Sequence, residues 1–285
     1  MSASTMNPPN LEPNASRHRR WYRDPSKLIP TLLVLLGFSL LYAFDMSSRR
    51  FSTDVIARRD EIFSLEYASS ILPDIFRGMY TTMRATVLAF LITVTLGLIL
   101  AILRRAKLKI IAWPTAFIIE FIRSTPILVQ FVFAQQLARV WFGLNVTSVS
   151  TATQLLILGL GVHYATYASE AYRAGIDSVP KGQWEASTAL NLSPVTKWTR
   201  VIIPQAVPNI LPTLGNYLVA ALKDAPIAGP VLAVPGVMFA ANTFRSDDFR
   251  AVEPMLLAGV AFLLVSLPLA WLVRRLEKRI GYERT

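Results

Sequence analysis

Hydrophobic residues occur along this 285-residue chain in long runs separated by short polar segments. A helix needs about 20 predominantly apolar residues to cross the hydrocarbon core of a bilayer. Several of the stretches that contain no Asp, Glu, Lys or Arg reach that length. These stretches are residues 28–44, 85–103, 124–138, 140–169, 201–222, 225–244 and 254–273. The pattern predicts an all-α, polytopic membrane protein.

The apolar runs predict six membrane spans. They are expected near residues 28–45, 78–103, 110–138, 152–172, 206–243 and 254–273. A polar string from Glu120 to Pro126 interrupts the third span, and the fifth contains several prolines together with Lys223 and Asp224. Proline cannot continue the helical hydrogen-bond ladder, so we expect the fifth span to break or kink at Pro226, within one turn of these two charges.

Composition and charge agree with this pattern. Only 16% of the residues are charged, against about 25% in an average soluble protein. The net charge of +11 lies in short basic runs beside the apolar spans, which is typical of the cytoplasmic side of a membrane protein and argues against a nucleic-acid partner. With the N-terminus placed inside, alternate segments carry 18 Lys and Arg residues inside and 7 outside. Both termini and the polar loop 170–206 are therefore expected in the cytoplasm.

The sequence offers little for catalysis or metal binding. It has no cysteine and only two histidines, His18 and His163, and it contains neither H-E-x-x-H nor G-x-S-x-G. The phosphate-binding pattern G-x-x-x-x-G-K-[ST] is also missing, so the chain is not itself an ATPase of that class. We therefore expect neither an enzyme nor a resident metal.

The loop 170–206 predicts two short helices. The first runs from Pro180 to Leu190, and Asn191 follows where a left-handed cap would end it. Ser193 and Pro194 form an N-cap and first-turn pair that starts the second helix, which Pro204 and Pro208 are expected to end. Its apolar face has no evident cover within the chain, and it comprises Val195, Trp198, Val201 and Ile202. One alternative is an amphipathic element that lies on lipid headgroups.

The same loop resembles the EAA loop of ABC importer permeases, whose pattern is Glu-Ala-Ala, three residues, Gly, nine residues, Ile-x-Leu-Pro. The spacing matches throughout, with Ser187 in place of the second Ala and Asn191 in place of Gly. The residues that carry the resemblance, and that it implies for coupling to an ATPase, are Glu185, Ala186, Ser187, Asn191, Trp198, Val201, Ile203 and Pro204.

Other segments are similar to the polar amino acid transporter subfamily, which includes histidine, arginine and glutamine permeases. They are RAGIDSVP at 173–180, GQWE at 182–185, FIRSTPILVQ at 121–130, and Lys223–Asp224. The subfamily usually has Thr-Ser after this last pair, where the chain has Ala225–Pro226. The departure falls in the expected translocation path, so it leaves the substrate open among polar amino acids, opines and ectoine-like solutes.

The resemblance implies a five-helix, type I ABC importer transmembrane core with one additional N-terminal helix. The expected domains are a cytoplasmic tail 1–27, an uncleaved anchor helix with its connector 28–75, and a transmembrane domain 76–280 that carries the coupling loop. The chain would be a multi-pass permease of the bacterial cytoplasmic (inner) membrane. Its implied partners are membrane lipid, a second permease in a homodimer or heterodimer, a cytoplasmic ABC ATPase dimer that binds ATP and Mg, and a periplasmic or extracellular solute-binding protein.

Polar residues at membrane depth are the candidates for the substrate pathway, because charges in hydrocarbon normally face a cavity or a partner. They are Glu120, Arg123, Ser124, Thr125, Gln130, His163, Lys223 and Asp224.

Structural roles for these residues remain open alternatives. Glu120 and Arg123 are spaced to neutralise each other on one helix face. Lys223 can tie helices together through Glu120 or Glu170, and His163 can simply pack beside neighbouring tyrosines. An ion-coupled secondary transporter is the alternative function, since such proteins also use broken helices with polar residues at mid-depth. The loop 170–206 distinguishes the two functions, because a secondary transporter does not need it.

Overall fold

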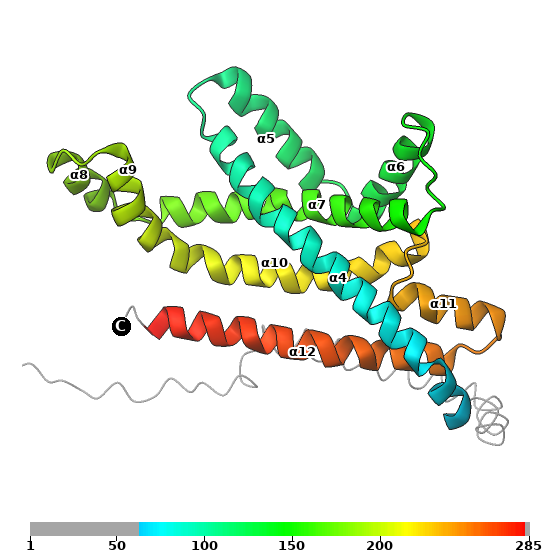
Figure 1. Ribbon diagram of the computed structural model, residues 1–285. Coiled ribbons are helices and arrows are strands. Elements are labelled where there is room, and N and C mark those ends of the chain that lie inside the picture. Colours follow the sequence, from blue (N-terminus) through cyan, green and yellow to red (C-terminus); the bar gives the residue numbers. More distant parts are fainter. Residues whose placement is uncertain (1–62, 283–285) are drawn as a thin grey trace, which may run out of the picture. The chain divides into compact units, whose positions relative to one another are not determined.

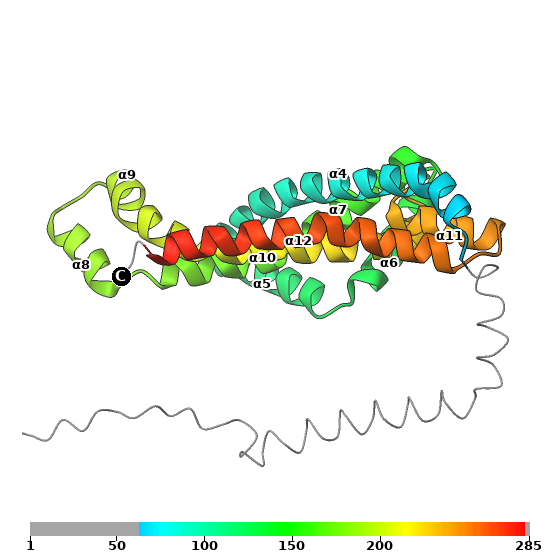
Figure 2. The ribbon, with the colours of Figure 1, turned by 90° about the horizontal axis from the view of Figure 1, so that it is seen from below.

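A computed structural model of the chain describes residues 63–282, with side chains as far as Glu277, and these residues belong to one compact unit, Ile62–Thr285. The tail and the anchor helix expected before residue 46 lie outside the described residues. Every regular element in the described part is helical (Figures 1 and 2). The elements are α4 (Leu65–Arg104), α5 (Lys109–Arg123), α6 (Ile127–Val140), α7 (Val149–Asp177), α8 (Lys181–Ala189), α9 (Pro194–Thr196), the π-helical segment η2 (Lys197–Ile202), α10 (Ile203–Leu232), α11 (Val237–Asp247) and α12 (Val252–Tyr282).

The long apolar helices have the length that a bilayer requires. Helices α4 and α12 qualify as membrane spans by length and hydropathy, and the pairs α5–α6 and α10–α11 qualify if each pair counts as one broken span. Helix α7 is more polar and packs against both α4 and α10. Helix α4 begins at Leu65 rather than near residue 78, so the final part of the predicted polar connector is helical.

Small residues set the close approach of α4 and α7, the most extensively packed helix pair of the unit. A Cβ atom added at Gly97 would lie 2.7 Å from Cβ of Ala168, and one added at Gly161 would lie 2.8 Å from Cβ of Ile92. Both distances are too short for a side chain to be tolerated without movement. Such small-residue contacts are typical of helix pairs in membranes, where packing rather than water exclusion drives association.

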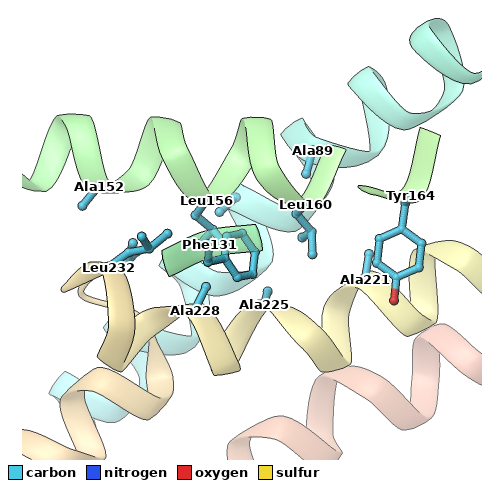
Figure 3. Close-up of a cluster of buried hydrophobic side chains, with 12 residues drawn as sticks. Ala89, Phe131, Ala152, Leu156, Leu160, Tyr164, Ala221, Ala225, Ala228 and Leu232 are labelled. Atoms are coloured by element: carbon cyan, nitrogen blue, oxygen red, sulfur yellow. The ribbon is translucent and has the colours of Figure 1, made fainter. Parts of the chain in front are cut away.

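An apolar core joins α4, α6, α7 and α10. Figure 3 shows the ring of Phe131 from α6 between Leu156 and Leu160 of α7 and the alanines Ala225 and Ala228 of α10. All five side chains are at most 2% exposed. The alanines leave room for the aromatic ring, so α6 is anchored in the bundle by one large side chain.

Both expected interruptions of the spans occur, but one lies at a different residue. Helices α5 and α6 meet at 110° across the polar string, as predicted. Helix α10 continues through Pro226 to Leu232, and the chain breaks only at residues 233–236, where Ala233 has a φ of 57° and α11 departs at 44°. The prediction of a helix break at Pro226 is therefore wrong. The left-handed backbone at Ala233 ends the helix instead.

The second helix of the loop 170–206 also differs from the prediction. Pro204 and Pro208 do not end it, because α9, η2 and α10 form one continuous helical run from Pro194 to Leu232. In the π-helical segment the amide of Ile203 donates to the carbonyl of Trp198, five residues earlier. This wider turn directly precedes Pro204, which has no amide hydrogen to donate. Helices α8 and α9 lie together at one end of the unit, and α11 lies at the other (Figures 1 and 2).

Candidate functional site

The turn between α8 and α9 is fixed by backbone hydrogen bonds. Asn191 has a φ of 50°, its amide donates to the carbonyl of Thr188 at 2.9 Å, and the amide of Leu192 donates to the carbonyl of Ser187 at 3.1 Å. This is the Schellman arrangement that ends a helix with a left-handed residue. The prediction that Asn191 replaces Gly as a left-handed cap is confirmed.

Side chains then join the two short helices into one element. Oγ of Ser193 accepts a hydrogen bond from the amide of Thr196 at 3.2 Å, which confirms the predicted N-cap. Nζ of Lys197 donates to Oγ1 of Thr188 at 2.9 Å across the turn. The rings of Trp184 and Trp198 meet edge to face with centroids 5.4 Å apart. The loop is therefore an ordered helical hairpin, which we call the coupling hairpin (residues 181–202) after the role that the sequence predicts for it.

The exposed surface of the coupling hairpin differs from the predicted apolar face. Ile202 is fully buried and Val201 packs beside it, so the prediction that the chain leaves this face uncovered is wrong for both. Ser187 is also buried. Exposed residues gather on α8 and around the turn, where a hollow of about 420 Å³ lies beside Glu185. The predicted coupling residues classed as exposed are Glu185, Ala186, Asn191, Trp198, Ile203 and Pro204.

A second group of predicted residues converges near the junction of α5 and α6. Nε2 of Gln130 donates to the carbonyl of Ile122 at 2.7 Å and to Oγ1 of Thr125 at 2.8 Å. Its Oε1 lies 3.0 Å from Nδ1 of His163 on α7. Because an amide oxygen only accepts, Nδ1 of His163 is the donor in this arrangement. Gln130 thus stabilises the sharp bend and ties it to α7.

Aromatic rings extend this group toward α10. The hydroxyl of Tyr164 donates to Oδ2 of Asp224 at 2.6 Å, and the guanidinium carbon of Arg123 lies 5.0 Å from the ring centre of Tyr167. Tyr217 of α10 lies 5.9 Å from Tyr167, ring centre to ring centre. We call the whole group the polar cluster, and its members are Arg123, Thr125, Gln130, His163, Tyr164, Tyr167, Tyr217 and Asp224.

Three of the predicted pathway residues lie outside these contacts. Ser124 is exposed at the bend, and Glu120 and Lys223 are exposed on their helices. Within residues 63–277 neither Glu120 nor Lys223 forms an ion pair. Pairing of Glu120 with Arg123 is therefore wrong, and so is a tie from Lys223 to Glu170 or Glu120. Lys223 is exposed, whereas Asp224 is partly buried against Tyr164, which agrees with the expectation that the two adjacent residues do not pair with each other.

Sequence reasoning missed two features of this region. Tyr217 precedes Asp224 by two helical turns, a spacing that places both on one face of α10 and that could have identified it. The other is an ion-pair network at the end of α4. Glu170 of α7 pairs with Arg104 and, at 2.7 Å, with Arg173, while Asp177 pairs with Arg105 at 2.8 Å. Nothing in the spacing of these residues pointed to a contact between two helices so far apart in sequence.

A bundle of apolar helices with a partly buried polar cluster between them and an ordered helical hairpin at one end is typical of a transport permease rather than an enzyme. The family described as "Binding-protein-dependent transport system inner membrane component" matches residues 93–282. The chain belongs to this family of ABC importer permeases, in which ATP hydrolysis is carried out by a separate subunit. The family membership decides against an ion-coupled secondary transporter.

Individual relatives agree with the family. The chain is 37% identical over 210 residues to the probable amino-acid ABC transporter permease protein y4tG of Sinorhizobium fredii, which covers 74% of this chain and 88% of that protein. It is 32% identical to the probable glutamine ABC transporter permease protein GlnM of Bacillus subtilis, across 71% of this chain and 91% of that one. Its fold is similar to a chain in the crystal structure of an amino acid ABC transporter with histidines, with a TM-score of 0.68, 30% identity, and coverage of 76% and 99%.

Proposed function

We propose that this permease moves a polar amino acid, or a solute with the same charged groups, through the polar cluster. The relatives named for amino-acid transport support this substrate class. The observation that carries the proposal is the presence of one basic and one acidic side chain in the same cluster, each held by a tyrosine of α7. Arg123 offers a cation for a carboxylate, and Asp224 offers an anion for an ammonium group.

The aromatic rings of the cluster give this pair of charges a defined setting. Tyr164 holds the carboxylate of Asp224, and the face of Tyr167 supports the guanidinium of Arg123. Polar residues in a membrane bundle are costly unless they face a partner or a cavity, which favours a role in transport. Lys223 and Glu120 are also proposed to line the pathway, although they are exposed in the single chain. A second permease protomer, in a homodimer or a heterodimer, would pack against these exposed surfaces.

We infer that the coupling hairpin binds the ATPase dimer, which would hold ATP and Mg. A rigid helical element that is exposed at one end can insert into a groove on its partner and transmit movement as one body. In this orientation the hairpin and both termini face the cytoplasm, and α11 lies on the outer side, where a solute-binding protein would deliver the substrate. The basic residues beside the spans support the same orientation.

The proposal is tested with the permease reconstituted in vesicles together with its ATPase and solute-binding protein. ATP hydrolysis is measured against a panel of glutamine, arginine, glutamate, cystine, an opine, ectoine and maltose. Stimulation by one or more amino-acid-like solutes is the expected result. R123Q should raise the solute concentration for half-maximal stimulation and leave basal hydrolysis unchanged. Stimulation by maltose alone would contradict the substrate class.

A further inference from the structure

A cavity of about 480 Å³ lies between α4 and the first turns of α7, at the end of the unit remote from the coupling hairpin. Its polar lining residues include Tyr80, Arg84 and Gln154. Its apolar lining residues include Leu88 and Ile157, which follow Arg84 and Gln154 by about one helical turn. The cavity shares no residue with the polar cluster.

Arg84 is the charged group of this cavity, and the described residues supply no partner for it. No ion pair, hydrogen bond or ring contact of Arg84 occurs within residues 63–277. Arg77, two turns earlier on the same exposed side of α4, pairs with Asp74 at 3.1 Å. Arginine favours oxyanions because its planar fork of N–H groups matches phosphate and carboxylate geometry. The open guanidinium therefore points to an anionic ligand.

The position of Arg84 along α4 places it at a membrane interface. The charge-free stretch 85–103 lies between Arg84 and Arg104. These two arginines are about 30 Å apart along the helix, the thickness of the hydrocarbon core. Arg104 is paired with Glu170 at its end, so Arg84 marks the opposite interface. Tyr80, one turn beyond Arg84, is of the residue type that is enriched at that level.

Exposed leucines on α4 and α7, at and next to the cavity, fit acyl chains. Leu88 and Leu91 of α4 are 38% and 58% exposed, and Leu158 of α7 is 53% exposed. The cavity lining contains no Asp or Glu, so the ammonium group of an amino acid would find no counter-charge there. An anionic lipid therefore fits both the cation and the apolar residues of the cavity, whereas the ammonium group of an amino acid or of phosphatidylcholine would find no counter-charge there.

We propose that this groove binds an anionic phospholipid, with Arg84 on the headgroup phosphate and the acyl chains along the exposed leucines of α4 and α7. The lipid would occupy the cavity and contact both α4 and α7 at this end. In the orientation proposed above, the site belongs to the outer leaflet.

The test uses the full-length permease purified in dodecyl maltoside and titrated with phosphatidylglycerol or phosphatidylcholine of identical chains, with bound lipids counted by native mass spectrometry. The wild type should bind phosphatidylglycerol about fivefold more tightly than phosphatidylcholine. This is the factor expected from one basic residue near an anionic lipid. R84Q should lose this preference, and R84K should retain most of it. R77Q is the matched control, because Arg77 already has an acidic partner, and it should behave as the wild type.

Three outcomes overturn the proposal. Equal binding of the two lipids by the wild type does so without any variant, even if R84Q does not accumulate. A preference that survives in R84Q places the lipid elsewhere. Displacement of phosphatidylglycerol by glutamate in the wild type but not in R84Q would show that the cavity takes a free carboxylate instead of a lipid.

Discussion

The coupling hairpin and the polar cluster are built in different ways. In the hairpin, the bonds that fix the turn join residues close in sequence, such as Ser187 with Leu192 and Thr188 with Lys197. In the polar cluster, Tyr164 of α7 donates a hydrogen bond to Asp224 of α10, which lies 60 residues later in the sequence. The turn of the hairpin is thus specified locally, whereas the cluster exists only when α5, α6, α7 and α10 pack correctly.

This difference separates two roles that a transport permease has to combine. A locally fixed turn that continues directly into α10 can carry force between a partner and the bundle. A cluster assembled from several helices changes its geometry whenever those helices shift, so it can respond to the transport cycle. Substitutions in the two regions should therefore fail in different assays.

The largest effect is expected for Glu185→Ala on the exposed side of α8. Loss of a hot-spot contact of about 2 kcal/mol should weaken binding of the ATPase by about 30-fold. Because the side chain is exposed, insertion and folding should not change. ATPase binding is measured by titration of the purified permease, and transport by uptake into vesicles. Glu66→Ala, at an exposed position in the first turn of α4, is the control. A normal affinity of Glu185→Ala for the ATPase would contradict the proposal that Glu185 of the hairpin contacts the ATPase.

A smaller but distinct effect is expected for Asp224→Asn in the polar cluster. The charged acceptor of the Tyr164 hydroxyl becomes a neutral amide, and a hydrogen bond to a charged group is worth about 1.5–3 kcal/mol. Solute-stimulated ATP hydrolysis should fall about tenfold or more while ATPase binding stays normal.

Tyr164→Phe sharpens this comparison. It removes the hydroxyl and keeps the carboxylate of Asp224, so it should reduce solute-stimulated ATP hydrolysis less than Asp224→Asn does. Equal solute stimulation of ATP hydrolysis in the wild type and both variants would show that Tyr164 and Asp224 serve helix packing alone.

Asn191 offers a graded test of local specification. Valine at a φ of 50° costs about 1–2 kcal/mol because its Cβ crowds the backbone, whereas glycine takes this conformation freely. Asn191→Val should increase hydrogen exchange in the turn between α8 and α9 and reduce transport, and Asn191→Gly should remain close to the wild type. A turn that is equally protected in both variants would show that contacts from the bundle, rather than the cap, hold the hairpin.

The smallest effect is expected for Pro226→Ala. Helix α10 is already continuous at this position, so alanine fits the same backbone and restores an amide donor. The change in the free energy of unfolding should lie below about 1 kcal/mol, since membrane helices accommodate internal proline by local adjustment. Thermal unfolding in detergent provides the measurement. A large loss of stability or transport would mean that the proline shapes α10 in a state that this structure does not represent.

Much of the molecule was predictable from local signals. Runs without charge predicted the membrane helices, and the polar string predicted the bend between α5 and α6. Asn191 predicted the end of the first short helix, and Ser193 predicted the start of the second. The continuity of α10 was not predictable in this way. Four prolines lie inside that helix, and its termination depends on the left-handed residue Ala233, whose side chain gives no signal for that conformation.

The sequence alone determined the class of this protein, because helices that cross hydrocarbon need long apolar runs and a helical turn needs particular residues at its ends. Tertiary structure decided which polar groups meet. Arg123 was spaced to pair with Glu120 but lies over Tyr167, and Glu170 was a possible partner for Lys223 but binds Arg104 and Arg173. Periodicity fixes the face of a helix on which a residue lies, but the partner across that face depends on how close the helices come. Here the small residues Gly97 and Gly161 set that approach.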